Sequence, residues 1–447
     1  MDTIFALATA RGRAGVAVIR VSGPGAGAAA RALVGDLPPA RRAGLRAVRH
    51  AGEVIDQALV LWFAAGASFT GEEVVELHLH GSMAVVQAVL DLLAATPGQR
   101  MAEPGEFTRR ALENGRLDLA QVEGLADLID SETEAQRRQA LRQMQGDLGR
   151  LYDGWRARLI RLLAHQEAAI DFSDEDLPEG VEDAVRVDVA ALAAELARHL
   201  ADDRRGERLR EGIRIAIVGP PNAGKSSLLN VLARRDAAIV AATPGTTRDV
   251  IEVHLDLAGY PVLLADTAGL REATEAVESE GVRRSLRAAQ EADLKLAVFD
   301  GALWPEIDAA TAALIDDNSI VVVNKNDIAR LPEPLATPER MNGRGAIPIS
   351  ALTGAGLDAL LAGIEAEVAR RWGAGGGVAL TRVRHRQALE RCAACLARIA
   401  PDGGETATAE TIAEDLRLAA RELGRITGRV DVEEILDVIF RDFCIGK

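Results

Sequence analysis

The chain has 447 residues, of which 48% are apolar, and a formal net charge of −15. This length predicts two or three domains, each with its own apolar core. The negative charge disfavours wholesale coating of nucleic acid, and three cysteines are too few for a disulfide framework. No apolar run reaches the ~18 residues of a membrane helix. We therefore expect a cytoplasmic protein that does not enter a membrane.

The first part of the chain has the pattern of an α+β domain. Short apolar runs at 16–21, 58–63 and 74–80 alternate with glycine-rich turns, as in strands, and 83–94 has the pattern of a helix. We place this N-terminal domain at residues 1–117.

From residue 118 the pattern becomes helical. Apolar residues recur every three or four positions, which predicts one long helix with an apolar stripe: Leu141, Met144, Leu148, Leu151, Trp155, Leu159 and Leu162. Near the end of the chain, Ile412, Leu416, Ala419, Leu423 and Ile426 again predict a helix. Between these segments, strand and helix patterns alternate as in a doubly wound α/β sheet. The sequence thus predicts a discontinuous helical domain, 118–209 plus 372–447, interrupted by an inserted α/β domain at 210–371.

The inserted domain begins with a phosphate-binding motif. A strand at 213–218 runs into GPPNAGKSS, where Gly219 and Gly224 bracket four residues and Lys225 and Ser226 open a helix. Bare backbone amides and the helix dipole can then face a phosphate. Lys225 is expected to reach the β- and γ-phosphates, and the Ser226 hydroxyl to ligate magnesium. The predicted contacts are Gly219, Asn222, Ala223, Gly224, Lys225, Ser226 and Ser227.

NKND, which follows the strand pattern at 320–323, selects the base. The carboxylate of Asp327 can accept the ring N–H and the exocyclic amine of guanine, donors that adenine does not present there. ATP would leave this carboxylate buried and unpaired, so GTP is the expected nucleotide. Ser350 and Ala351 fit the loop that closes over the base. The predicted contacts are Asn324, Lys325, Asp327, Ser350, Ala351 and Leu352.

TPGTTRD and DTAGL supply the two switch segments. Asp266 ends an apolar run, where it can hold magnesium through water, and the Gly269 amide can meet the γ-phosphate. Either Thr246 or Thr247 can supply the second hydroxyl. The predicted nucleotide contacts in these segments are Ala241, Thr243, Gly245, Thr246, Thr247, Asp266, Thr267, Ala268 and Gly269.

Hydrolysis requires a group that orients water. Leu270 follows DTAG, and an apolar side chain cannot do this. Four carboxylates in the second switch segment are candidates, and the motif does not choose among them: Glu272, Glu275, Glu278 and Glu280.

These GTPase motifs occur together with VAVIRVSG, SFTGEEVVELHLHG, PGEFTRRALENGRLDLAQ and a terminal CIGK. The combination, over essentially the whole chain, resembles the MnmE (TrmE) family of tRNA-modification GTPases. The motifs outside the nucleotide site are the more specific part of this resemblance. It implies an N-terminal folate-binding domain that forms a homodimer, a split helical domain and an inserted G domain.

The resemblance also assigns roles in hydrolysis. It implies that the G domains dimerise across the nucleotide and that potassium takes the place of an arginine finger. Asn222 would bind potassium through its side-chain carbonyl, with backbone carbonyls from Ala241, Thr243 and Thr246. Thr247 matches the second magnesium ligand, with Ser226 the first. Glu278 matches the glutamate that positions water.

Members of the family bind 5-formyl- or 5,10-methylene-tetrahydrofolate. With MnmG, an FAD-dependent partner, they form a heterotetramer that adds a carboxymethylaminomethyl-type group at C5 of the wobble uridine of tRNA. The folate contacts implied here are Arg20, Glu76, Arg116 and Lys447, and Arg116 stands where the family pattern predicts Lys. Cys444 is implied to be needed for modification, although a buried apolar cysteine is an equal alternative.

Two features of the sequence bear on other interpretations. Cys392 and Cys395 form a CxxC without a second pair, so helix packing explains them better than zinc does. The rival function is a regulatory GTPase of ribosome assembly without one-carbon chemistry. Such a protein should carry a basic RNA-binding module, whereas residues 378–447 hold eleven basic and twelve acidic residues.

Overall fold

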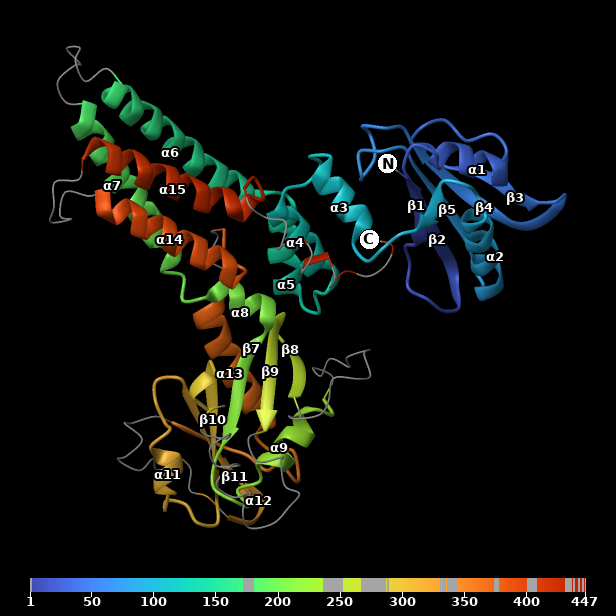
Figure 1. The fold of residues 1–447 in the computed structure, drawn as a ribbon. Helices are drawn as coiled ribbons and strands as arrows, with labels where there is room; N and C mark the ends of the chain where they lie inside the picture. Colours follow the sequence, from blue (N-terminus) through green and yellow to red (C-terminus); the bar gives the residue numbers. More distant parts are fainter. Residues whose placement is uncertain are drawn as a thin grey trace, which may run out of the picture. The chain divides into compact units, whose positions relative to one another are not determined.

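A computed structural model describes residues 2–171, 181–235, 252–266, 287, 289–329, 331, 335, 345–373, 378–399 and 408–430, together with 436, 439, 440, 443 and 446. Two compact units are formed (Figure 1). The first comprises residues 1–126, 142–195 and 388–447, and the second comprises 127–141 and 196–387. Within the described segments, none of the helices has an apolar stretch long enough to span a bilayer.

The first unit contains a six-stranded sheet of order β3-β4-β5-β2-β1-β6. All its neighbouring strands run antiparallel except β1 and β6, which are parallel. Apolar side chains on one face, among them Ile19, Val75 and Leu77, pack with Val89 and Leu93 of α2. The elements are β1 (Thr3–Leu7), β2 (Ala14–Ser22), α1 (Ala26–Val34), β3 (Gly44–His50), β4 (Glu53–Phe63), β5 (Val74–Gly81), α2 (Met83–Ala94) and β6 (Gln99–Met101).

Helices complete the first unit. α3 (Glu106–Glu113), α6 (Asp147–Asp171) and α15 (Ala409–Thr427) lie wholly in it. Four further helices each have residues in both units: α4 (Leu119–Ile129), α5 (Glu134–Met144), α7 (Val181–Leu200) and α14 (Val383–Ile399). The tail is helical, as its apolar periodicity predicted, and α15 lies along α6 (Figure 1). Cys392 and Cys395 are free, buried thiols within α14, and burial raises the pKa of both.

The prediction of one long helix through 141–162 was wrong. Leu141 and Met144 belong to α5, whereas Leu148 and the later residues of the stripe belong to α6. Gly146 lies between the helices with φ +84°, a left-handed conformation that ends a right-handed helix. The apolar periodicity continues across the break because both helices bury one face.

The second unit contains a six-stranded sheet of order β12-β11-β10-β7-β9-β8. Only β8 is antiparallel to its neighbour. One face packs on Leu228 and Leu360, and the other contributes Phe299 to a second apolar cluster, as in a doubly wound sheet. The elements are α8 (Arg205–Glu211), β7 (Ile213–Val218), α9 (Lys225–Leu232), β8 (Glu252–Leu257), β9 (Tyr260–Asp266), β10 (Leu294–Asp300), α11 (Ala309–Ala312), β11 (Ser319–Asn324), α12 (Asn326–Ala329), β12 (Ala346–Pro348) and α13 (Leu357–Trp372).

The register of this sheet places the ends of the motif-bearing strands side by side. Ile217 of β7 is paired with Asp266 of β9, Val218 with Ala297 of β10, and Asp300 of β10 with Asn324 of β11. Because five strands are parallel, their carboxyl ends meet at one edge. The segments that follow β7 and β11 therefore lie at that edge.

Candidate functional site

Two glycines shape the loop after β7, because a side chain at either position would clash with its surroundings. A Cβ at Gly219 would lie 2.3 Å from the Val298 carbonyl oxygen, and a Cβ at Gly224 would lie 2.1 Å from Nδ2 of Asn324. Gly224 also has φ +93° and is the residue before the first turn of α9. The loop thus wraps tightly around the amino end of α9, where the direction of the backbone N–H groups and the helix dipole favour an anion.

Lys225 spans this loop from the first turn of α9. Its side chain is buried, and Nζ donates to the carbonyl oxygens of Gly219 and Pro220, each at 2.9 Å. The ammonium therefore lies within the phosphate-binding loop. Ser226 and Ser227 are exposed on the same turn of the helix.

Asn324 ties the phosphate loop to the base-binding loop. Its side chain is buried, with Nδ2 donating to the Ala223 carbonyl at 2.9 Å. Its Oδ1 accepts from the Ala351 N–H, also at 2.9 Å. One amide therefore fixes two loops that are 128 residues apart in sequence, counted from 223 to 351.

Asp327 is exposed at the amino end of α12 and is oriented by a buried serine. The Ser350 hydroxyl donates to Oδ1 of Asp327 at 2.6 Å, and the Thr353 N–H donates to the Ser350 oxygen at 3.1 Å. Oδ2 of Asp327 keeps its accepting capacity among the described residues. Leu352, in the same loop, is 85% exposed.

A second cluster lies on the sheet of the first unit. Arg20 of β2 and Glu76 of β5 are paired in register, and Nε of Arg20 donates to Oε1 of Glu76 at 3.0 Å. The Arg20 guanidinium also lies over two aromatic rings, 5.7 Å from the centroid of Phe69 and 5.6 Å from that of Phe107. A guanidinium beside aromatic rings and a carboxylate can accommodate a flat, polar ring system with carboxylate groups.

The loop carrying Phe69 is fixed by a buried network. Glu72 accepts from the Ser22 hydroxyl at 2.7 Å and from Nη1 of Arg110 at 3.1 Å. The Ser22 and Thr70 hydroxyls share a hydrogen bond of 2.8 Å. Phe69 itself is 38% exposed, so its ring is accessible to solvent beside this network.

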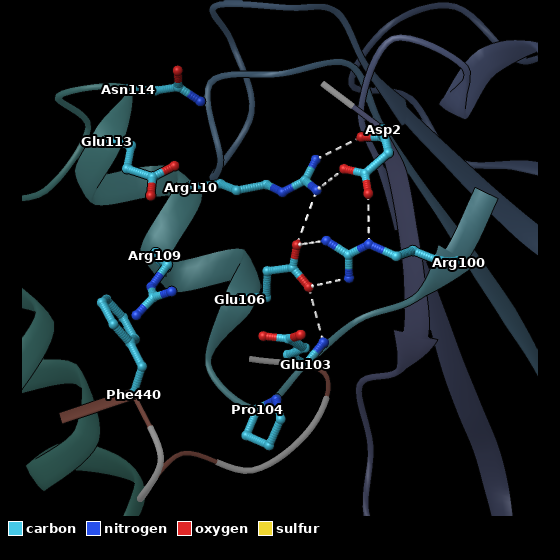
Figure 2. A pocket seen from close by; sticks show the side chains of 10 residues that line it. All are labelled: Asp2, Arg100, Glu103, Pro104, Glu106, Arg109, Arg110, Glu113, Asn114 and Phe440. Carbon is cyan, nitrogen blue, oxygen red and sulfur yellow. Dashed lines mark hydrogen bonds and ion pairs between the residues drawn. The ribbon is translucent and has the colours of Figure 1, made fainter. Parts of the chain in front are cut away.

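Arg110 extends this network to the wall of a cavity of about 550 Å³ beside α3 (Figure 2). Glu106 accepts from Arg100 at 2.6 Å and from Arg110 at 3.0 Å, and Asp2 accepts from both arginines. Burial raises the pKa of Glu106, but the hydrogen bonds from Arg100, the Glu103 N–H and Arg110 outweigh it and leave the pKa below its ordinary value. The carboxylate is therefore held ionised.

Two family models and full-length relatives match this chain. The family model described as "GTP-binding protein TrmE N-terminus" matches residues 3–116, and the model for the MnmE helical domain matches 119–444. A curated relative from Rhodospirillum rubrum, described as "tRNA modification GTPase MnmE", is 57% identical over the full length of both chains. A relative with the same description from Paramagnetospirillum magneticum is 56% identical, again over both full lengths.

The chain belongs to the MnmE family of tRNA modification GTPases. The resemblance read from the motifs is thus confirmed, as is the fold class of an N-terminal α+β domain, a helical bundle and a P-loop α/β domain. Among solved structures, the chain is similar to Era from Aquifex aeolicus, 26% identical over 41% of this chain and 66% of that chain, with a TM-score of 0.28.

Within this MnmE-family chain, several residues predicted to bind the nucleotide contact one another: Lys225 with Gly219, Asn324 with Ala223 and Ala351, and Ser350 with Asp327. Asp266 ends β9 next to β7, and Asn222 is exposed in the phosphate loop. Arg116 is exposed and lies against Gly71, whose Cβ would be 3.3 Å from Cγ of Arg116. The predicted residues outside the described segments are Ala241, Thr243, Gly245, Thr246, Thr247, Thr267, Ala268, Gly269, Glu278, Cys444 and Lys447.

Sequence reasoning missed three residues that contact predicted site residues. Phe69 and Phe107 enclose Arg20, and Asp300 forms an ion pair with Lys325. Phe69 lies in the family motif SFTGEEVVELHLHG and Phe107 in PGEFTRR, so the motifs contained both. For Asp300 the sequence offered only an acidic residue at the end of an apolar run, because the pairing of β10 with β11 is visible in the structure alone.

Proposed function

We propose that this MnmE-family chain binds GTP at the carboxyl edge of the second unit's sheet, hydrolyses it, and uses the cycle in modifying tRNA. One observation carries this proposal: the Asn324 side chain joins Ala223 in the phosphate loop to Ala351 in the base loop. A phosphate-binding loop and a base-reading carboxylate are thereby held in one rigid arrangement. Such preorganisation lowers the cost of ordering the site around a nucleotide.

The base is selected by Asp327. With Oδ1 held by the Ser350 hydroxyl, the carboxylate can accept from both the ring N–H and the exocyclic amine of guanine. At the other end, Lys225 now donates to two neutral carbonyl oxygens. Phosphate oxygens are stronger acceptors because their hydrogen bonds are charge-assisted, so the ammonium would turn from the loop to the β- and γ-phosphates.

Two cations would complete this site. Ser226 offers a hydroxyl oxygen beside Lys225, a hard ligand that suits magnesium, with Thr247 as the second ligand. The exposed Asn222 side chain makes no hydrogen bond with another described residue, so its carbonyl oxygen is available to potassium. Bound there, the cations would neutralise charge that develops on the phosphates. Glu278 would position the attacking water.

Arg20, Glu76, Arg116 and Lys447 would bind 5-formyl- or 5,10-methylene-tetrahydrofolate in the domain at 1–117. Glu76 can accept hydrogen bonds from the N–H groups of the pterin, while Arg116 suits the glutamyl carboxylate. The Phe69 ring adds an aromatic surface of the kind that a pterin stacks on. The folate would supply the one-carbon unit, with Cys444 taking part in modification.

We further propose that the chain forms a cytoplasmic homodimer and a heterotetramer with MnmG, which carries FAD. The complex would add a carboxymethylaminomethyl-type group at C5 of the wobble uridine. The GTPase would be the domain at 210–371, inserted into a helical domain at 118–209 plus 372–447.

The alternative is a regulatory GTPase of ribosome assembly that has no one-carbon chemistry. Titration of the full-length protein with 5-formyl-tetrahydrofolate separates the two. Binding that is lost in Glu76→Gln and kept in Glu53→Gln, an exposed carboxylate on β4, supports the modification function. Wild-type protein that binds GTP but no tetrahydrofolate favours the alternative.

A further inference from the structure

Asp300 holds the lysine of the base-binding motif. It is the last residue of β10 and is paired in register with Asn324, the last residue of β11. Its Oδ2 lies 2.6 Å from Nζ of Lys325, the residue that follows Asn324 in the chain. Its Oδ1 accepts from the Ala302 N–H at 3.0 Å, which fixes the orientation of the carboxylate.

The backbone around Lys325 is also restrained by the turn that follows Asp300. Lys325 has φ +66°, a left-handed conformation that a lysine adopts only when its surroundings impose it. The Gly301 N–H donates to the Asn324 carbonyl at 2.7 Å, and a Cβ at Gly301 would lie 2.7 Å from that same oxygen. Asp300 and Gly301 thus restrain both the main chain and the ammonium at this turn.

Lys325 stands between two residues that already have fixed positions. Asn324 is tied to the phosphate loop, and Asp327 is tied to Ser350. A free lysine side chain samples many rotamers, and ordering it when a ligand binds costs affinity. With its ammonium pinned by Asp300, the methylene stem is already ordered, and such a stem can cover the flat face of a purine.

We propose that Asp300 is a positioning residue for the guanine nucleotide, which holds Lys325 so that its methylene stem forms a preorganised wall of the base pocket. The inference rests on the proposed GTP site and adds a residue to it. Asp300 acts by positioning Lys325 and does not itself form a hydrogen bond with the base. Its loss should weaken binding of any purine nucleotide that the site accepts, without changing the discrimination made by Asp327.

If the Asp300–Lys325 ion pair served only the stability of the fold, its loss would not change nucleotide affinity. The Lys325 and Asp300 side chains are 33% and 16% exposed, and partly exposed ion pairs add little to stability. The chain offers a matched control on the same strand: Lys295 of β10 pairs with Asp316 at 2.7 Å, far from the base loop in the sheet register. Removing either aspartate should have a similar small effect on thermal unfolding. Only Asp300 should affect nucleotide binding.

The test compares wild type with Asp300→Asn, Asp300→Glu and Asp316→Asn in the full-length protein. Asp300→Asn keeps the acceptor for Ala302 and removes the charge. We expect it to raise the Kd of GDP and the KM for GTP about 3- to 10-fold, with kcat at saturating GTP within about 2-fold of wild type. The Kd of IDP, which lacks the exocyclic amine, should rise by the same factor. Asp300→Glu should restore part of the affinity.

The outcomes separate the inference from the function on which it rests. Asp300→Asn protein with the GDP affinity of wild type and of Asp316→Asn overturns the positioning role alone. A changed ratio of GDP to IDP affinity would also overturn it, because Asp300 would then read the base directly. Wild-type protein that binds no GDP would overturn the proposed function itself.

Discussion

Asn324 and Ala223 are joined by a hydrogen bond of 2.9 Å between a buried amide and a backbone carbonyl. The same amide approaches Gly224 so closely that a Cβ there would lie 2.1 Å from its nitrogen. The strand that ends in the base-binding motif is therefore packed directly on the phosphate loop. In the proposed GTP site, this contact would couple recognition of the base to recognition of the phosphates.

The first prediction concerns the choice of base. Asp327→Asn should weaken GTP binding by about 100-fold. The carboxylate accepts hydrogen bonds from two N–H groups of guanine, whereas the amide of Asn would turn an N–H group of its own toward one of them and leave that donor unpaired. Xanthosine triphosphate, with an acceptor in place of the amine, should bind the variant better than GTP. Competition against labelled GDP measures both. Retained preference for GTP in the variant would contradict the assigned contact.

The second prediction concerns hydrolysis. Glu278→Ala should leave GTP affinity near that of wild type and slow turnover at least about 100-fold, because the water loses its orienting carboxylate. Glu272→Ala, Glu275→Ala and Glu280→Ala serve as matched controls, since these carboxylates lie in the same segment. Single-turnover hydrolysis in potassium checks this. If one control is the slow variant instead, the role belongs to that residue.

The third prediction concerns potassium. Asn222→Ala should remove the stimulation of hydrolysis by potassium over sodium while leaving GDP binding nearly unchanged, because the side chain is exposed and supports no other described residue. Turnover measured across potassium concentrations gives the result. Equal stimulation in wild type and variant would place the cation elsewhere.

The fourth prediction concerns the ring that covers Arg20. Phe69→Ala removes one of two aromatic faces from the guanidinium, so the affinity for 5-formyl-tetrahydrofolate should fall about 5- to 20-fold. Met83→Ala, at an apolar residue 59% exposed in the same domain, should bind as wild type does. Calorimetric titration distinguishes them. If Phe69→Ala binds 5-formyl-tetrahydrofolate with the affinity of wild type, Phe69 does not belong to the folate site.

The fifth prediction concerns pH and the network in Figure 2. The folded-state pKa of Glu106 lies below its ordinary value of 4.5, so its contribution to stability is present above that pH and is lost as pH falls through the folded pKa. Glu106→Gln should destabilise the chain by about 2 kcal/mol at neutral pH and flatten the acid dependence.

Thermal unfolding of the full-length protein at several pH values measures this effect. Glu113→Gln is the matched control, because Glu113 is exposed on the same helix and forms no ion pair with another described residue. An acid dependence that is identical in wild type and Glu106→Gln would assign it to other carboxylates.

The sequence predicted local structure where the spacing of a few neighbouring residues determines the shape of a loop. The loop from Gly219 to Ser226 and the pair Asn324 and Asp327 are short-range patterns with one physical solution. The break at Gly146 was missed because apolar periodicity continues across it. The pair of Asp300 with Lys325 was missed because it arises from the register of two parallel strands, which sequence spacing does not reveal. Likewise, Phe69 and Phe107 meet Arg20 only after three separate elements fold together.

The most direct measurement is mass spectrometry of wobble nucleosides from cells that lack this protein and are complemented with wild type or with Asp327→Asn. Wild type should restore the C5-modified uridine, and the variant should not do so at ordinary GTP levels. A modification that persists without the protein, or that Asp327→Asn restores fully, would contradict a tRNA modification driven by GTP at this site.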